Sequence, residues 1–332
     1  MFMKLSIIIC SRNRANHLRP TLKSLGQVEA SQGTSVEAIL VDNGSSDGTA
    51  DCVGDWQPKN MAVRYVREER GGKSYGLNNA VARANGDVLL FADDDVRFPQ
   101  EWLQTMSAPI VAGRASAVQG AIRIAAHLMR PWMTDRIREN LAHIEPSPGE
   151  TTDLIGANMA ISRAVFEKVP AFDVELGPGP ASGGEDTLFG WQMGEAGFRI
   201  ETAPNSVVEH HFDESRLTRR SLLLAAQKGA YSDAYMRHHW LHESYPDPER
   251  ALRHALLRLA YFRMLRWNDW RRNDRCTDWE IGGVKSIWAY RHYLTERRRP
   301  RNYERKGLCK IAGRFSDARI AEVPSGASQC NA

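Results

Sequence analysis

The sequence predicts an α/β fold, with a mainly parallel central sheet flanked by helices and a helical C-terminal extension. Short apolar runs alternate with segments of helical periodicity through the N-terminal part, a pattern typical of parallel sheets. Polar and acidic residues follow these runs, where such sheets bind ligands beyond the carboxyl ends of their strands. After about residue 215 the apolar runs give way to longer helical segments.

The first strand is expected at Leu5–Cys10, because a continuous short apolar run is typical of a strand covered on both faces. After the polar segment Ser11–Arg14, the residues Leu18, Leu22 and Leu25 recur at helical spacing. The sequence therefore predicts a strand, a polar turn and a helix in this order.

Two further strands are expected at Val36–Val41 and Met61–Val66. The polar run Asp42–Thr49 follows the first of them and offers several helix N-cap residues. The second leads into Gly71–Ser74 and then a helix, which Asn85 and Gly86 end. Strand and helix thus continue to alternate.

The fourth strand, at Val88–Phe91, leads directly into Asp93, Asp94 and Asp95. Three adjacent carboxylates repel one another, and a divalent cation with oxygen ligands would offset that repulsion. An acidic turn before Phe98 is the alternative explanation. Because Asp42 also follows a predicted strand, we expect all four carboxylates at one edge of the sheet.

Composition indicates a soluble globular protein, since 42% of the 332 residues are hydrophobic and 25% are charged. This length allows one large domain or two smaller ones. The start of the sequence lacks the features of a secretory signal. The cysteines show neither metal-binding spacing nor a disulfide framework, so a cytoplasmic location is expected. They are Cys10, Cys52, Cys276, Cys309 and Cys330.

Several motifs, in this order, resemble family-2 glycosyltransferases with the GT-A fold. SIIICSRNR, ILVDNGSSDGT and GKSYGLNNAVARANGDVLLFADDDV resemble the family's nucleotide-binding half, here about residues 1–97. The acceptor half, about residues 98–215, contains the later motifs. These are Gly156–Ile161 with Phe172 and Asp173, then Gly183–Asp186 before a helix at Thr187–Ala196, and finally Ser206–His210.

The resemblance implies a nucleotide-diphosphate-sugar donor, expected to be a UDP-sugar, and Mn²⁺ or Mg²⁺ as cofactor. It implies Asp95, Asp93 and His210 as metal ligands, and the imidazole favours Mn²⁺. Which two of the three aspartates contact the metal stays open. The expected nucleotide-sugar-binding residues are Ser11, Arg12, Asn13, Asp42, Lys73, Asn78, Asp93, Asp94 and Glu185.

The sequence departs from the family pattern at two positions. Arg12 stands where many relatives have an aromatic residue that stacks on the base, although a guanidinium can also stack on a ring. Asn43 stands where many relatives have a second acid. These departures leave the identity of the base open.

Asp186 is the expected catalytic base, which removes the proton of the acceptor hydroxyl as it attacks the anomeric carbon. One such candidate base, together with the resemblance, implies inversion. Glu185 and Asp186 also suit the first turn of a helix, so capping is the alternative role. We expect the glycine-rich run 177–184 to be a mobile loop over the site.

Residues 216–312 are expected to form a helical, basic extension, and 313–332 a disordered tail. Thr218–Tyr235 has helical character. Ala251–Trp270 mixes apolar residues with arginines, for which we favour a buried scaffold helix over a helix lying on the inner face of a membrane. The basic cluster Arg297–Arg301 would attract anionic lipid or a lipid-phosphate acceptor. No nucleic-acid motif accompanies it.

The sequence thus predicts an inverting, metal-dependent glycosyltransferase that transfers a sugar to a hydroxyl on a glycan or lipid-linked saccharide. A nucleotidyltransferase on a related fold is one alternative, but it would need a glycine-rich loop after the first strand. A catalytically silent sugar-nucleotide or glycan-binding protein is another. Such a protein would be expected to lose the acidic triplet or the Glu185–Asp186 pair, and both are present.

Overall fold

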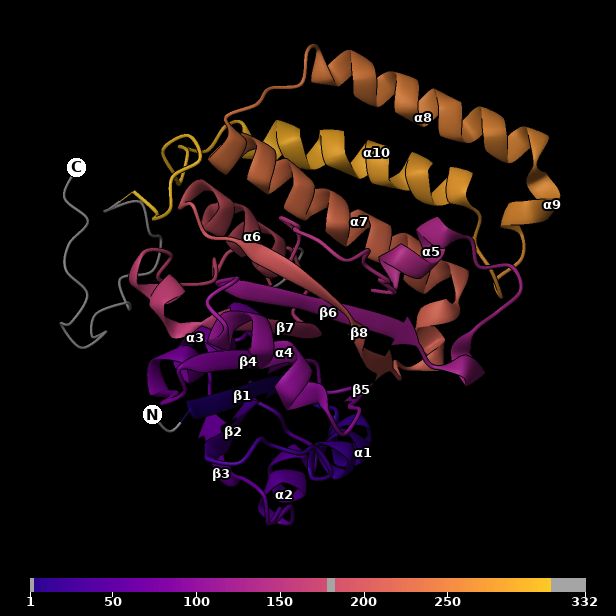
Figure 1. The fold of residues 1–332 in the computed structure, drawn as a ribbon. Helices are drawn as coiled ribbons and strands as arrows, with labels where there is room; N and C mark the ends of the chain where they lie inside the picture. Colours follow the sequence, from indigo (N-terminus) through magenta and orange to yellow (C-terminus); the bar gives the residue numbers. More distant parts are fainter. Residues whose placement is uncertain (1–2, 178–182, 312–332) are drawn as a thin grey trace.

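A mixed eight-stranded sheet forms the centre of the molecule, with the strand order β3-β2-β1-β4-β7-β6-β8-β5 (Figure 1). The computed structural model describes residues 3–177 and 183–311. Four of the strand pairings are parallel and three are antiparallel. The strands are β1 (Met3–Ser11), β2 (Thr34–Asp42), β3 (Ala62–Arg67), β4 (Val88–Ala92), β5 (Val96–Arg97), β6 (Ala117–Ile124), β7 (Asn158–Ser162) and β8 (Ile200–His210).

The register of the parallel strands gathers polar residues at one edge of the sheet. β1 lies between β2 and β4, and Ser11 is opposite Asp42. Ile9 is opposite Ala92, so the acidic triplet begins one residue beyond this pairing. The carboxyl ends of the three strands therefore meet, as the sequence predicts.

Helices cover both faces of the sheet, and alternating side chains of β1 divide between two cores. Ile7 and Ile9 pack with α1 (Ala15–Leu25), α2 (Thr49–Gly54) and α4 (Trp102–Val111). Ile8 packs in the other core, with α3 (Lys73–Arg83), α6 (Glu185–Glu195) and the 3₁₀ turn η2 (Arg163–Glu167). Because both faces of the strand are covered, its sequence is continuously apolar.

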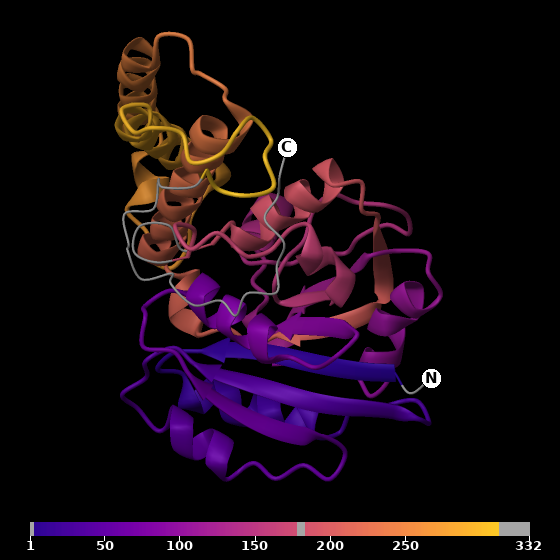
Figure 2. The ribbon, with the colours of Figure 1, turned by 90° about the vertical axis from the view of Figure 1, so that its left-hand side faces the viewer.

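Three long helices form the C-terminal extension, which stands beside the sheet domain (Figure 2). α10 packs between α7 and α8, and α8 lies farthest from the sheet (Figure 1). Shorter elements connect these parts. The remaining helical elements are η1 (Ala126–Leu128), α5 (Asp135–Asn140), η3 (Glu214–Leu217), α7 (Arg219–Met236), the π-helical turn η4 (Arg237–Leu241), α8 (Pro248–Leu265), α9 (Trp267–Trp270) and α10 (Asp278–Glu296).

The expectation of a buried scaffold helix at Ala251–Trp270 is wrong. α8 ends at Leu265, and within it the structure buries only Pro248 and Leu259. Leu257 and Met264 are 69% and 78% exposed, respectively. The physical reason is that α8 packs mainly on α10 among the long helices, which leaves most of its outer face exposed.

Buried polar contacts dock the extension onto the sheet domain. The Asp173 carboxylate accepts hydrogen bonds of 2.7 Å from the hydroxyls of Tyr235 and Tyr303. The Nζ of Lys310 lies 2.5 Å from the same carboxylate. An acid of the sheet domain is thus held by three residues of the extension.

Some expectations fall outside the described residues. They concern the centre of the glycine-rich run, 178–182, and the tail 313–332. Among the helices that the structure describes, none combines the length and the apolar character needed to cross a bilayer.

Candidate functional site

A cavity of about 470 Å³ lies at the carboxyl ends of β1 and β4. It brings together five residues predicted as nucleotide-sugar-binding, from three separate segments of the chain. Its wall also includes residues that sequence reasoning did not select. The predicted residues are Ser11, Arg12, Lys73, Asp93 and Asp94, and the others are Cys10, Arg14, Asn43, Gly71, Gly72 and Gly177.

Arg14 is the main residue that sequence analysis missed. Its Nη2 lies 2.5 Å from Asp95 Oδ2, and its Nη1 lies 3.3 Å from Asp94 Oδ1. The Ser11 hydroxyl donates to Asp94 Oδ2 at 2.6 Å. Burial raises the pKa of Asp94 to about 6, although the Arg14 charge acts in the opposite direction. The guanidinium thus compensates two of the three adjacent carboxylates.

Asp95 and His210 are both buried and lie side by side. The pairing of β5 with β8 places them so, because Val96, the residue after Asp95, is opposite His210. Asp95 Oδ1 lies 3.3 Å from His210 Nε2. The Nδ1 of this ring lies 3.0 Å from the Leu141 carbonyl oxygen, which orients the ring. Burial opposes ionisation of Asp95, but His210 and Arg14 hold its pKa well below the ordinary value.

A divalent cation fits part of this arrangement. Asp95 Oδ1 is a buried oxygen without a hydrogen bond of good geometry in the described structure, and it faces a ring nitrogen. One carboxylate and one imidazole are suitable protein ligands when substrate phosphates complete the shell. Nevertheless, the described residues contain no ready cluster of three acidic, histidine or cysteine ligands, and Asp93 points to Lys73 instead.

Lys73, at the start of α3, lies between two acids. Its Nζ donates to Asp93 Oδ1 at 2.6 Å and lies 3.9 Å from Glu185 Oε1. Burial opposes its charge, but Asp93, Glu185 and Asp186 raise the pKa of Lys73 above its ordinary value. Burial, followed by the charge of Asp186, raises the pKa of Glu185 to about 7. Lys73 is therefore a firmly charged cation in the cavity wall.

Glu185 and Asp186 open α6 with different surroundings. Glu185 is buried, and its Oε2 has no hydrogen-bond partner in the described structure. Asp186 is partly exposed. Its Oδ2 accepts the Gly156 N–H and its Oδ1 the Thr187 N–H, both at 2.8 Å. These bonds fix the Asp186 carboxylate near Lys73, but neither acid belongs to the cavity wall.

Asp42, Asn13 and Asn43 shape the turns around the cavity. Asp42 is buried and accepts hydrogen bonds from the Ser45 N–H and the Tyr65 hydroxyl, both at 2.7 Å. Asn13 Oδ1 accepts the Ser46 N–H at 2.8 Å. Asn43 accepts the Gly72 N–H at 2.9 Å and thereby holds the glycine loop before Lys73. An amide is useful at position 43 because Asn43 also donates to backbone carbonyls.

Asn78 is the predicted site residue that the structure directs elsewhere. Its side chain donates to the Phe172 carbonyl and accepts the Phe172 N–H, both at 2.8 Å. It is not part of the cavity wall. In this structure Asn78 joins α3 to the segment before the glycine-rich run.

Comparison with known proteins gives one family. The family model described as glycosyl transferase family 2 matches residues 6–170. The succinoglycan biosynthesis protein ExoM of Rhizobium meliloti is 26% identical over 217 residues, which cover 64% of this chain and 69% of that protein. The uncharacterized glycosyltransferase YfnE of Bacillus subtilis is 37% identical over 94 residues, 28% of this chain and 24% of that protein. The chain spans less than half the length of most curated relatives that it matches.

A solved structure shares the fold. It is the mannosyltransferase PcManGT of Pyrobaculum calidifontis, in complex with GDP-Man and Mn²⁺. The TM-score is 0.60 at 16% identity, and the match covers 90% of this chain and 87% of that one. The likeness therefore extends through the helical extension as well as the sheet.

Proposed function

Because the chain belongs to glycosyltransferase family 2, we propose that it transfers a sugar from a nucleotide-diphosphate donor to a hydroxyl acceptor. The family and the GT-A fold expected from the sequence are confirmed by the family match and the structural likeness. The observation that supports the activity most is the cavity at the carboxyl ends of β1 and β4. It combines two cations, Arg14 and Lys73, with the acids Asp93 and Asp94.

The donor diphosphate belongs beside Lys73 and Arg14 in this proposal. Charge-assisted hydrogen bonds from such cations are roughly twice as strong as those between neutral groups. Arg12, exposed in the cavity wall, is positioned to stack on the base. We propose a uridine nucleotide. Guanosine is the alternative, since the mannosyltransferase with this fold was solved with GDP-Man.

Asp95 and His210 are the residues proposed to hold Mn²⁺ or Mg²⁺, with Asp93 as a further ligand once it leaves Lys73. The ion would neutralise the charge that develops on the diphosphate leaving group. Arg14 occupies Asp95 Oδ2 here. It must therefore turn away from Asp95 to expose this oxygen, and in turning it becomes available to the diphosphate.

Asp186 is the proposed catalytic base, in an inverting reaction. Being partly exposed, it can reach an acceptor hydroxyl, whereas Glu185 is buried behind it. Its two backbone N–H bonds orient the carboxylate and leave each oxygen a further lone pair for that hydroxyl. Glu185 is proposed to act on Lys73, whose Nζ lies 3.9 Å from Glu185 and 2.6 Å from Asp93.

The proposed acceptor is a hydroxyl on a glycan or a lipid-linked saccharide. We propose a cytoplasmic location with peripheral contact to the inner face of a membrane. The exposed apolar and basic residues of α8 support this contact. No nucleic-acid partner is proposed.

A donor panel tests the activity. Hydrolysis of UDP- and GDP-sugars is measured with Mn²⁺, with Mg²⁺ and with a chelator, in the absence of an acceptor. We expect slow hydrolysis of one donor, faster with Mn²⁺ than with the chelator. Absence of hydrolysis and of binding across the whole panel would contradict the proposal and favour a protein with another ligand.

A further inference from the structure

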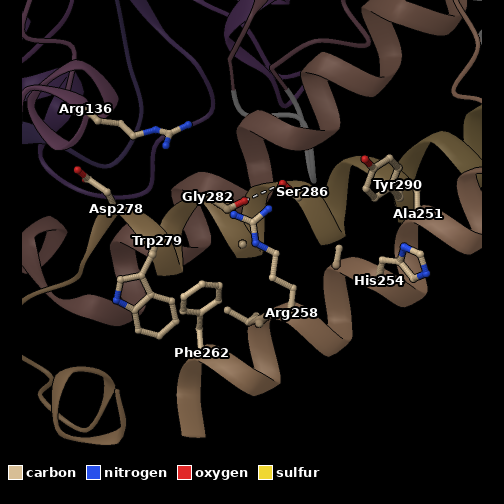
Figure 3. A pocket seen from close by; sticks show the side chains of 13 residues that line it. Arg136, Ala251, His254, Arg258, Phe262, Asp278, Trp279, Gly282, Ser286 and Tyr290 are labelled. Carbon is tan, nitrogen blue, oxygen red and sulfur yellow. Dashed lines mark hydrogen bonds between the residues drawn. The ribbon is translucent and has the colours of Figure 1, made fainter. Parts of the chain in front are cut away.

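A second cavity, of about 520 Å³, forms a groove between α8 and α10 (Figure 3). The two helices meet closely at one point, where a Cβ added to Gly283 would lie 2.9 Å from Leu259 Cδ1. The groove opens beside this contact and also includes Arg136 of α5. It shares no lining residue with the cavity at the carboxyl ends of β1 and β4, which is called the donor cavity below.

Two arginines make the groove suitable for an anion. Arg136 Nη1 would lie 3.5 Å from a Cβ on Gly282, so its guanidinium rests over the helix backbone. Arg258 extends from α8 toward Gly282 and Ser286 (Figure 3). Neither guanidinium has a carboxylate partner in the described part of the chain. Asp278 is the one acid in the lining, and its Oδ1 accepts the Thr134 hydroxyl at 2.7 Å.

Aromatic rings supply an apolar end to the same groove. The rings of Phe262 and Trp279 lie 6.0 Å apart, and Arg258 lies 5.8 Å from the centre of the Phe262 ring. His254 and Tyr290 lie toward the other end (Figure 3). The groove thus offers positive charge in the middle and apolar surface beside it, which suits an anion attached to an apolar group.

The outer face of α8 borders this groove and is apolar. Counted from Leu257, exposed apolar residues recur at i+4, i+7 and i+8, which places them on one side of the helix. Arg250 and Arg253 are exposed on the same side. The one acid of α8, Glu249, is paired with Arg297. The exposed apolar residues are Leu256, Leu257, Tyr261, Met264 and Leu265, and Trp267 follows in α9.

We propose that this surface docks on an anionic phospholipid bilayer, with the groove holding the phosphate of one lipid headgroup. The apolar side chains of α8 enter the interface while the arginines remain at headgroup level, as in other interfacial helices. Charge selects this occupant over a second copy of the chain, because two faces that both bear unpaired arginines repel each other. The inference rests on the proposed membrane contact and adds a specific lipid site to it.

Vesicle co-sedimentation and a soluble lipid test the groove separately. The vesicles contain phosphatidylcholine alone or with one-third phosphatidylglycerol, at low salt. The soluble probe is dihexanoyl phosphatidylglycerol below its micellar concentration, followed by calorimetry. The variants are Arg136→Gln with Arg258→Gln for the groove, Arg250→Gln with Arg253→Gln as a pair of equal charge outside it, and Leu257→Ser with Met264→Ser for the apolar face.

Each arginine pair should weaken binding to anionic vesicles by about tenfold or more, since both remove two charges near the surface. The groove pair alone should abolish binding of the soluble lipid, and the apolar pair should reduce vesicle binding only. Equal effects of the two arginine pairs on the soluble lipid would overturn the groove site. Absence of wild-type binding to anionic vesicles, or self-association that the apolar pair abolishes, would overturn the docking surface.

Nucleotide-sugar hydrolysis without acceptor, measured in solution, separates this inference from the proposed function. It should be unchanged in all three variants, because none of the altered residues lines the donor cavity. Failure of hydrolysis in the wild type would contradict the proposed function and leave the lipid results intact.

Discussion

Asp186 and Glu185 are adjacent in the chain but occupy different positions relative to solvent. The Asp186 carboxylate is partly exposed and held by two backbone N–H groups, whereas Glu185 is buried and faces Lys73. A base must reach the acceptor, so exposure favours Asp186. Glu185 is buried and its Oε1 lies 3.9 Å from Lys73 Nζ, so we propose that it positions this cation.

The first prediction compares these two acids. Asp186→Asn preserves size and one oxygen for the backbone contacts but cannot accept the acceptor's proton. Turnover should fall by about 10²–10⁴-fold, the usual contribution of a general base. Donor affinity, measured by calorimetry, should stay nearly unchanged.

Glu185→Gln is the matched control and should reduce turnover less than Asp186→Asn. If Glu185→Gln abolishes turnover while Asp186→Asn retains it, Glu185 is the base. If both variants remain active, the pair serves to cap α6.

Five of the residues that line the donor cavity could be predicted from the sequence, and most of these follow directly from the ends of strands. Ser11 and Asp94 lie together for this reason. The sequence could not show that the Arg14 guanidinium lies against Asp95, because side-chain direction depends on packing. The same reason applies to Asn78: it follows Lys73 by about 1.4 turns of α3, on another side of the helix, and it bonds to Phe172.

At the scale of elements, Glu280 of α10 joins the three long helices of the extension. Arg219 of α7 donates to it through Nε at 2.8 Å, and Arg263 of α8 donates through Nη2 at 2.8 Å. Glu280 is buried, so its charge depends on these partners. It therefore fixes how α7 and α8 pack on α10.

The second prediction is that Glu280→Gln destabilises the protein by about 3 kcal/mol, because it removes the buried carboxylate to which Arg219 and Arg263 both donate. Asp233→Asn is the control. It breaks the ion pair of 2.9 Å with Lys285 between the same helices, α7 and α10, but at the surface. This control should lower the free energy of unfolding by less than about 1 kcal/mol. Unfolding in urea measures both, and equal losses would show that Glu280 has no special role.

The third prediction concerns acid stability. Burial opposes ionisation of Glu280, but hydrogen bonds from Arg219 and Arg263 outweigh it and lower the pKa of Glu280 from its ordinary 4.5. As the pH falls, Glu280 therefore takes up a proton at a higher pH in the unfolded chain than in the folded protein. The contribution of ionised Glu280 to the free energy of unfolding is present above pH 4.5 and is lost as the pH falls further. Urea unfolding between pH 7 and pH 3 should show a smaller loss for Glu280→Gln than for the wild type; an equal loss would exclude Glu280 as a source of acid sensitivity.

Strands were easier to predict than helices of the extension. The first strand was expected at Leu5–Cys10 and is found at Met3–Ser11, because a strand buried on both faces has a continuous apolar sequence. α8 has apolar residues on both sides as well. Composition cannot distinguish burial on both sides from an apolar face that has no neighbour in the described chain.

At the scale of the molecule, the donor cavity and the α8 surface belong to different layers. The sheet domain supplies the cavity, and the extension is docked to it through Asp173 of the acceptor half. Binding a membrane through α8 would thus leave the cavity free. This arrangement fits an enzyme that takes a soluble donor and an acceptor close to a lipid surface.

The central claim is that a nucleotide sugar binds at the carboxyl ends of β1 and β4 through a divalent cation held by Asp95. Calorimetric titration of the donor into the wild type, Asp95→Ala and Asp95→Asn, with Mn²⁺ and with a chelator, tests it most directly, and thermal unfolding confirms that each variant is folded. We predict strong donor binding only for the wild type with Mn²⁺, and weak, Mn²⁺-independent binding for both variants. Equal donor affinity in all three proteins, with or without Mn²⁺, would contradict the account.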